Sequence, residues 1–419
     1  MLRPTPLLIL AYNRPDKMAG LIDSLRATKP QLVLVVVDGP KPGDAADAAR
    51  VQAVRDAVRG IDWEAEVRTR FRPVNVGLRA SVTDAVSWAV GEYGQVAVIE
   101  EDVEPGPAFL PYVEAMLERY RDDRRIAHVS GYNVVPPAQL ASTTGSRLTA
   151  YPESIAWATW DRAWALYDDD LGWLQRRPAA QLRAITGRRS AAIRWLQNLR
   201  DADAGRISTW AYRWIASMWS AGALCVSPNV NLVRYVGHDE GTHTLTTASW
   251  TELPVYEGPV DALLADEPVL DRAADAWVNR VVFRGTPIGV IRGVLVTAVL
   301  ALRQQGQHRA DLGNRVDAAR HPVADQQQGR VAEDQVQGRL AQLTVQADRA
   351  IVADRAVDHG NTGREHQHQQ DEVGADQAGD DPERGDEAAD RLNVGEASGG
   401  QVQRGRHRSG HPGDDHQQV

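Results

Sequence analysis

Apolar and polar positions in the first 133 residues follow two alternating periods. Short runs of apolar or β-branched residues predict five strands, at 7–11, 32–37, 67–71, 96–99 and 126–130. Between them, apolar residues at helical spacing predict helices, most clearly at 78–90 and 109–120. Continuous apolar strands are typical of a parallel sheet that is buried on both faces. We therefore predict a doubly wound α/β architecture, a mostly parallel sheet flanked by helices that binds ligands where its strands end.

From Tyr151 onward the pattern becomes helical and rich in tryptophan. Eight tryptophans contribute to it: Trp157, Trp160, Trp164, Trp173, Trp195, Trp210, Trp214 and Trp219. Their rings either form a core or stack on a sugar ring. We divide the chain into an α/β half (1–133), a Trp-rich half of the same domain (134–250), a C-terminal helical extension (251–303) and a low-complexity tail (304–419).

The tail differs from the rest of the chain in composition. No aromatic residue follows Phe283, and Gln, Asp, Arg, Gly, Ala and His dominate from about residue 304. Such a segment buries too little apolar surface to offset its conformational entropy. We predict that the tail is disordered or is an out-of-frame translation of GC-rich DNA, and we assign no metal site to its histidines.

Charge and cysteine content narrow the class of protein. A net charge of -9 gives no support for nucleic-acid binding, and the single Cys225 fits a reducing compartment. The apolar stretch 285–302 is interrupted by Arg292 and is too short to span a bilayer. It predicts either a packed helix or a helix on a membrane surface. We expect a cytoplasmic protein, either free or peripheral to the inner face of the membrane.

Three consecutive acids, Glu100, Glu101 and Asp102, directly follow the predicted strand 96–99. They fit a solvated turn, charges at the start of the next helix, or a site for a hard cation. Carboxylate oxygens suit Mn²⁺ or Mg²⁺, which normally also take oxygens from a bound diphosphate.

Further candidate side chains follow the other strands. Asp38 comes after the second strand, where it either binds a ribose or base or closes a turn. Asn75 and Gly77 precede a helix that carries Arg79 in its first turn, an arrangement suited to anions. The chain has no G-x-G-x-x-G after its first strand, no phosphate-binding G-x-x-x-x-G-K-[ST] loop and no G-x-S-x-G motif. These absences disfavour a dinucleotide oxidoreductase, a P-loop enzyme and an α/β-hydrolase.

The order of these segments resembles glycosyltransferases of the GT-A fold. The segments are "LILAYNRPDKM", "VVVDGP", "NVGLRASV", "VAVIEEDVEPGPAFLPYVEAMLERY" and "IAHVSGYN". They are similar to the family 2-like bacterial sugar transferases and to their relatives of the N-acetylglucosaminyltransferase I type. The resemblance covers about residues 5 to 245. It implies a Rossmann-like fold whose first half binds a nucleotide sugar and whose second half binds the acceptor.

The resemblance also implies roles for individual residues. Asp102 matches the acid that ligates the divalent metal, and Glu100 and Glu101 match acids that contact the donor. Tyr12, Asn13 and Arg14 fall in a loop that touches the nucleotide, and Asp38 matches the acid that reads the base. In the anion-suited loop, Asn75, Gly77 and Arg79 are further candidates for donor binding.

Two departures from the family pattern change the expected site. Glu101 stands where Asp is usual, and Ala211 stands where some relatives carry an Asp that could act as the general base. The expected base is therefore Asp239 or Glu240, with Asp161 as a further candidate. His243 is a candidate third metal ligand. The alternative for the segment "GHDEGTH" is a polar turn.

The expected activity is a metal-dependent, inverting transfer of a sugar from a UDP-, GDP- or dTDP-sugar. The acceptor would be a hydroxyl of a glycan or glycolipid, as in polysaccharide biosynthesis. Two alternatives are a nucleotidyltransferase that makes sugar nucleotides and a non-catalytic relative that binds a nucleotide or glycan. No nucleic-acid partner is expected.

Overall fold

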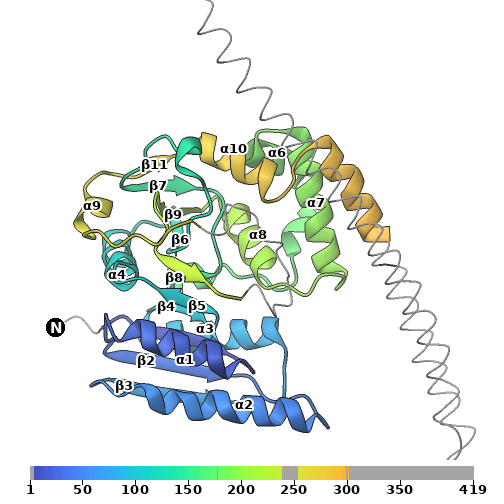
Figure 1. The fold of residues 1–419 in the computed structure, drawn as a ribbon. Coiled ribbons are helices and arrows are strands. Elements are labelled where there is room, and N and C mark those ends of the chain that lie inside the picture. The colour runs from blue at the N-terminus through green and yellow to red at the C-terminus, as the bar shows by residue number, and fades with distance from the viewer. Residues whose placement is uncertain (1–3, 177, 238–252, 299–300, 302–419) are drawn as a thin grey trace, which may run out of the picture. The chain divides into compact units, whose positions relative to one another are not determined.

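The computed structural model describes residues 4–176, 178–237, 253–298 and 301. Its centre is a nine-stranded sheet with the order β11-β7-β9-β6-β8-β4-β1-β2-β3. Figure 1 shows this sheet running from β3 at the bottom to β11 at the top. The strands are β1 (Leu7–Ala11), β2 (Leu32–Val37), β3 (Glu66–Phe71), β4 (Gln95–Glu100), β6 (Ile126–Ser130), β7 (Ser146–Thr149), β8 (Ala156–Trp160), β9 (Leu224–Pro228) and β11 (Val269–Leu270).

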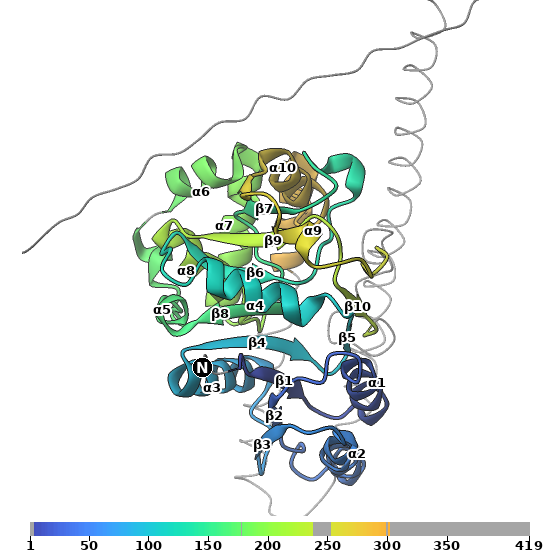
Figure 2. The same cartoon turned by 90° about the vertical axis from the view of Figure 1, so that its left-hand side faces the viewer.

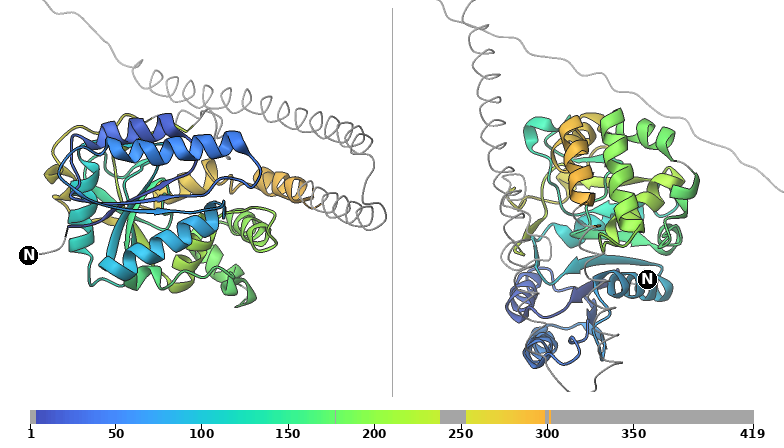
Figure 3. Two further views of the ribbon diagram at one scale, coloured as in Figure 1. Left: turned by 90° about the horizontal axis from the view of Figure 1, so that it is seen from below. Right: turned by 90° about the vertical axis from the view of Figure 1, so that its right-hand side faces the viewer.

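Helices of the first half cover both faces of strands β1 to β4. They are α1 (Pro15–Leu25), α2 (Ala45–Ala57), α3 (Leu78–Tyr93) and α4 (Phe109–Arg119). In the left panel of Figure 3, α1 and α2 lie above this part of the sheet and α3 lies below it. The apolar stripe of α3 is buried from Val82 to Val90, as its spacing predicts.

The second half adds strands to the same sheet and packs further helices against it. These helices are α5 (Asp161–Trp164), α6 (Ala179–Thr186), α7 (Arg189–Asp203), α8 (Ala211–Ala221), α9 (Asp261–Leu264) and α10 (Arg272–Val281). Short 3₁₀ turns lie at η1 (Val58–Gly60), η2 (Pro137–Gln139) and η3 (Gly172–Arg176). A small second sheet pairs β5 (Val103–Pro105) with β10 (Val233–Tyr235).

The predicted fold class is confirmed: the chain folds as a mostly parallel α/β sheet with helices around it. One detail of the prediction is wrong, because β3 is not buried on both faces. All six residues of β3 are exposed, since β3 is the edge strand and its charged residues Glu66, Arg68 and Arg70 face solvent. The tail 304–419 lies outside the described residues.

A second difference from the predicted sheet positions the candidate site. Strand β8 lies between β4 and β6 and runs antiparallel to both, so the sheet is not doubly wound throughout. Because both β4 and β6 oppose β8, they point in the same direction and end at the same edge. In the β4–β8 pair, Ile99 lies opposite Ala156. The loop before β8 therefore lies at the edge where β4 ends.

The tryptophans of the second half form its core. All eight named above are at most 6% exposed, from Trp195 at 0% to Trp164 at 6%. The rings pack on one another: Trp157 stacks on His128 at 5.0 Å between ring centroids and on Trp210 at 5.3 Å. Rings that are buried in this way cannot stack on a sugar, so the core interpretation is the correct one.

The end of the described chain is a helix at residues 287–298 that packs on α7. The side-chain amide of Gln197 donates to the Val290 carbonyl at 3.3 Å, and the Thr297 hydroxyl donates to Asp201 at 2.7 Å. The opposite face exposes Ile288, Ile291 and other apolar side chains. No helix in the described part of the chain is long and apolar enough to cross a membrane. The cytoplasmic location stays a prediction.

Candidate active site

The acidic triplet lies at the carboxyl end of β4, close to β5, β10 and α1 (Figure 2). Glu101 and Asp102 are 4% and 3% exposed, whereas Glu100 is partly exposed. The amide of Glu101 donates to the carbonyl of Leu10 at 3.0 Å, which extends the β1–β4 ladder into the triplet. On the other side, the amide of Val236 donates to the carbonyl of Asp102 at 2.9 Å. The backbone thus holds both buried acids at the edge of the sheet.

Arg14 is the cation that the buried acids require. Its Nε donates to Glu101 Oε1 at 3.0 Å, and its Nη1 donates to Asp102 Oδ2 at 2.8 Å. Arg14 immediately precedes α1, and its side chain is only 17% exposed. Two adjacent buried carboxylates repel each other, so one shared guanidinium offsets part of the cost of burying them.

Burial and neighbouring charges act differently on the pKa values of Glu100 and Glu101. Burial raises the pKa of Glu100 to about 8, with a further increase from the charges of Asp102 and Glu101 and an opposing effect of Arg14. Burial also raises the pKa of Glu101, although Arg14 partly offsets this increase. Before a cation binds, burial therefore favours the protonated form of Glu100, while Arg14 favours the ionised form of Glu101.

One oxygen of the triplet is suited to a cation. Asp102 Oδ1 is buried and has no hydrogen-bond partner, whereas Oδ2 binds Arg14. An unpartnered buried carboxylate oxygen is costly unless a cation or donor reaches it. Within the described residues, no group of three or more His, Cys, Asp or Glu side chains is arranged to hold a metal. These residues fit a divalent cation that takes one oxygen from Asp102 and the others from a diphosphate and water.

Tyr12 and Asn13 are held together by Asp47, a residue that the sequence analysis missed. Asp47 is 1% exposed and accepts hydrogen bonds from the Tyr12 hydroxyl at 2.7 Å, the Asn13 amide at 2.6 Å and the backbone N–H of Lys41 at 2.8 Å. Burial opposes the ionisation of Asp47, but these bonds outweigh it and lower its pKa. The spacing of Asp44 and Asp47 indicates a helix start, and Asp44 caps α2. That local pattern does not indicate that Asp47 contacts Tyr12 and Asn13, which lie in the loop after β1.

Asp38, Asn75 and Gly77 also lie together, where the loops after β2 and β3 meet. Asp38 Oδ1 accepts from the amides of Gly39 at 2.8 Å and Val76 at 3.1 Å, and Oδ2 accepts from Gly77 at 3.1 Å. The side-chain amide of Asn75 donates to the Gly39 carbonyl at 3.2 Å. Gly77 has a φ of 82°, which favours glycine. Asp38 thus joins the two loops, and its role in reading a base stays a prediction.

Two further predicted site residues, Arg79 and Asp161, make hydrogen bonds away from the triplet. Arg79 donates to Asp169 at 3.1 Å on the surface. The amide of Asp161 donates to the carbonyl of Gly94 at 2.9 Å, which places Asp161 beside the start of β4, at the opposite end of that strand from Asp102. Three further candidates, Asp239, Glu240 and His243, lie outside the described residues.

Tyr235 of β10 and Gly237, which follows β10, pack closely against Asp102. Burial and the charges of Asp102 and Glu100 raise the pKa of Tyr235. A Cβ atom at Gly237 would overlap Asp102 Oδ2 and the hydroxyl of Tyr235. The glycine therefore lets the chain pass directly over the carboxylate.

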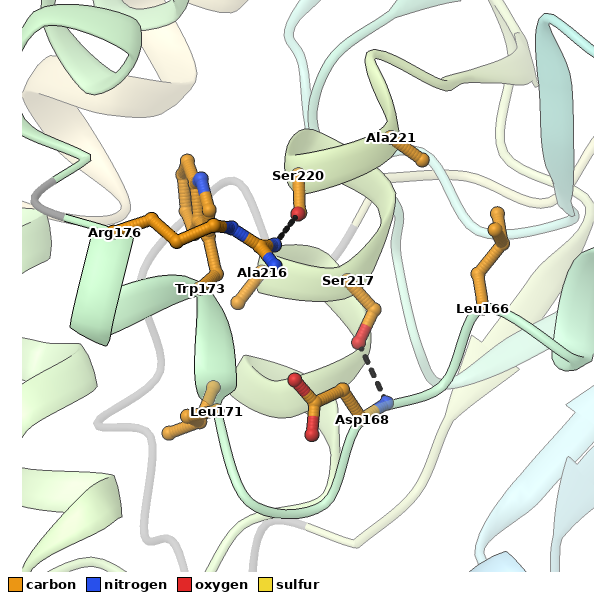
Figure 4. Close-up of a pocket in the computed structure, with 9 residues that line it drawn as sticks. All are labelled: Leu166, Asp168, Leu171, Trp173, Arg176, Ala216, Ser217, Ser220 and Ala221. Atoms are coloured by element: carbon orange, nitrogen blue, oxygen red, sulfur yellow. Dashed lines mark hydrogen bonds between the residues drawn. The ribbon is translucent and has the colours of Figure 1, made fainter.

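A small cavity of about 150 Å³ lies elsewhere, between α8 and the turn that precedes η3 (Figure 4). The amide of Asp168 donates to the Ser217 hydroxyl at 2.9 Å, and Arg176 donates to the Ser220 hydroxyl at 2.6 Å. The Asp168 carboxylate accepts from the backbone N–H groups of Asp170 and Gly172. Because these groups bond to one another, we assign the cavity no role.

Comparisons with known proteins give one family match and similar solved structures. None of the curated proteins matches the chain. A solved structure, "Mannosyltransferase PcManGT from Pyrobaculum calidifontis in complex with GDP-Man and Mn2+", is 14% identical, with a TM-score of 0.31, and the match covers 72% of this chain and 87% of that one. Residues 7–170 match the family model described as "Glycosyl transferase family 2". The match over residues 7–170, which hold the acidic triplet and the loops around it, supports a glycosyltransferase.

Proposed function

We propose that the chain transfers a sugar from a nucleotide diphosphate to a hydroxyl of a glycan or glycolipid, with a divalent metal and with inversion. The observation that supports this most directly is Asp102, whose Oδ1 is buried without a partner at the edge of the sheet, within the residues that match glycosyl transferase family 2. When bound there, Mn²⁺ or Mg²⁺ would stabilise negative charge on the leaving diphosphate as a Lewis acid.

The residues around Asp102 have separate parts in this proposal. Arg14 fixes the orientation of Asp102 through Oδ2 and leaves Oδ1 free for the cation. Glu100, the partly exposed acid of the triplet, contacts the sugar or the ribose of the donor. Tyr12 and Asn13, whose side chains donate hydrogen bonds to Asp47, contact the nucleotide of the donor in this proposal.

The transfer itself is a single displacement at the anomeric carbon. The acceptor oxygen forms a bond to that carbon from the face opposite the diphosphate, and the bond from carbon to the phosphate oxygen breaks. A carboxylate takes the proton of the acceptor hydroxyl as general base. Because attack and departure occur on opposite faces, one displacement inverts the configuration.

A thermal-shift panel with the full chain tests the proposal. UDP-glucose, GDP-mannose and dTDP-glucose are added with and without Mn²⁺, and the melting temperature is measured. A donor at about 100 times its dissociation constant adds roughly 2.7 kcal/mol of stability. We expect at least one donor to raise the melting temperature, and Mn²⁺ to increase that shift.

The variant Asp102→Asn is expected to lose the Mn²⁺-dependent part of the shift and metal-dependent donor hydrolysis, because an amide is a poor ligand for a hard cation. Asp201→Asn is the matched control: Asp201 is also buried and paired with an arginine, Arg206, at 2.7 Å. It is expected to keep the Mn²⁺-dependent shift. A wild-type chain that none of the donors stabilises would contradict the proposal, and binding without hydrolysis or transfer would indicate a non-catalytic relative.

A further inference from the structure

Glu153 lies at the same edge of the sheet as the triplet, in the loop between β7 and β8. Its amide donates to the hydroxyl of Ser130, the last residue of β6, at 3.1 Å. Its carbonyl lies 3.1 Å from Nε2 of His128, and the next strand begins at Ala156, opposite Ile99 of β4. The backbone of Glu153 is thus anchored at the carboxyl end of β6, on the edge where β4 leads into the triplet.

The side chain of Glu153 is available for chemistry. It is partly exposed, and its hydrogen bonds within the described residues involve only its backbone N–H and C=O groups. Three carboxylates that follow strands of the described sheet are engaged: Glu101 and Asp102 bind Arg14, and Asp38 binds backbone amides. A half-desolvated carboxylate without a hydrogen-bond donor is free to accept a proton from a ligand.

A series of close side chains connects Glu153 to the triplet. The charge of Glu153 and that of Tyr235 act on Tyr132 and add to the effect of burial, which raises the pKa of Tyr132. Tyr235 in turn lies close enough to Asp102 and Glu100 for their charges to raise its own pKa. Glu153 and the triplet are thus linked through Tyr132 and Tyr235, at the edge of the sheet where β4 and β6 both end.

We propose that Glu153 is the general base of the transfer, accepting the proton of the acceptor hydroxyl as its oxygen bonds to the anomeric carbon and the bond to the diphosphate breaks. The inference rests on the proposed function and assigns the base that this function requires. It differs from the expectation that Asp239 or Glu240 fills this role.

The surroundings of Glu153 suit a base that works near neutral pH. Burial raises the pKa of Glu153 to about 7, and the charge of Arg147 opposes the increase. The other titratable groups that face it are Tyr132, Cys225 and His128. His128 is neutral, because burial lowers its pKa to about 3. A base whose pKa lies near the working pH combines a large ionised fraction with strong proton affinity.

A competing structural role makes a different prediction. Arg147 is 5% exposed, and its guanidinium donates to Pro228 O at 2.7 Å, Asn133 Oδ1 at 2.9 Å and Asn229 Oδ1 at 3.2 Å. Those acceptors are neutral, so Glu153 could serve only to balance the charge of Arg147. Removing such a counter-charge would destabilise the fold, whereas removing a base would affect only the chemical step.

The test uses donor hydrolysis and azide transfer by the full chain, with UDP-glucose, GDP-mannose and dTDP-glucose as donors in the presence of Mn²⁺. Water must lose a proton when it attacks the sugar, whereas azide attacks without losing one. For Glu153→Gln we expect hydrolysis to fall about 100-fold or more, with formation of glycosyl azide within about threefold of wild type. The wild-type rate of hydrolysis should rise with pH through about 7, and Glu153→Gln should lose this dependence.

The matched control is Glu114→Gln. Glu114 is also a partly exposed glutamate whose pKa burial raises, but it lies on α4 and not in the loop before β8. Both of its rates should stay near those of wild type. Equal losses of hydrolysis and azide transfer in Glu153→Gln, or a lower melting temperature, would assign Glu153 the structural role. The pattern expected for Glu153→Gln, found instead in Asp239→Asn or Glu240→Gln, would overturn the inference. Inactivity of the wild-type chain with every donor would contradict the proposed function itself.

Discussion

At the scale of single residues, the site depends on one guanidinium that serves two carboxylates. Arg14 forms an ion pair with both Glu101 and Asp102. Truncating one partner of a buried ion pair typically costs about 3–5 kcal/mol, because the remaining charge stays buried. A divalent cation at Asp102 would supply part of the lost compensation.

We therefore expect Arg14→Ala to lower the free energy of unfolding by about 3 kcal/mol without metal, and by less in the presence of Mn²⁺. Chemical denaturation with and without Mn²⁺ measures both values. Arg206→Ala is the control: it removes the partner of Asp201, and Mn²⁺ should leave its loss of stability unchanged. A loss in Arg14→Ala that Mn²⁺ does not reduce would argue against a cation at Asp102.

The sequence allowed us to predict site residues that are consecutive at the end of one strand. It did not allow us to predict site residues that are far apart in the chain and meet only in the folded structure. Glu100 to Asp102 stand out because three acids follow an apolar run. Asp47 contacts Tyr12 across 35 positions of the chain, and its local pattern indicates only a helix start. Glu153 reaches the site only because β8 is inserted between β4 and β6, and no periodicity in the sequence indicates that strand order.

At the scale of elements, the loops after β2 and β3 act as one unit. Asp38 bonds to both loops, and a Cβ atom at Gly39 would overlap the backbone of Val74. Backbone cannot move aside as a flexible side chain can. The close approach of the two loops thus depends on the absence of a side chain at residue 39.

Gly39→Ala should separate the loops, reduce donor binding at least tenfold and destabilise the fold by about 2 kcal/mol or more. Gly43→Ala is the control from the same loop: its φ is 78°, but a Cβ there meets nothing within 4 Å. It should cost only the strain of that backbone angle, about 1 kcal/mol. Calorimetric titration and denaturation compare the two variants, and equal effects would contradict the role of the close approach.

At the scale of the whole molecule, buried carboxyl groups should make stability depend on pH. Burial raises the folded-state pKa of Asp275 to about 6, that of Glu153 to about 7 and that of Glu100 to about 8. The unfolded chain releases these protons first, so stability falls as pH rises from about 4 towards 8. His128 acts in the opposite sense: its pKa is lowered to about 3, so it costs stability as pH falls below about 6.5. Because three carboxyl groups act in one sense and one histidine in the other, the net effect is a loss of stability as pH rises from 5 to 8.

We expect the melting temperature without metal to fall by about 5 °C between pH 5 and pH 8. Thermal unfolding across this range measures the trend. Asp275→Asn should flatten it, since an amide does not titrate, while its single oxygen can still accept one of the two hydrogen bonds that Thr149 and Ala150 donate to the carboxylate. A melting temperature that rises steadily from pH 5 to pH 8 would contradict the dominance of the raised carboxyl groups.

The stacked rings beside the loop that holds Glu153 also provide an intrinsic spectroscopic probe of that loop. The ring centroid of Trp157 lies 5.0 Å from that of His128 and 5.3 Å from that of Trp210, and the centroid of Trp164 lies 5.1 Å from that of Trp214. Electronic transitions of indoles this close couple to one another and give a strong near-ultraviolet circular dichroism signal. The ring of His128 lies directly against the backbone of Glu153, so a ligand that shifts this loop should alter that signal. Ligand binding could thus be followed spectroscopically without attaching a label.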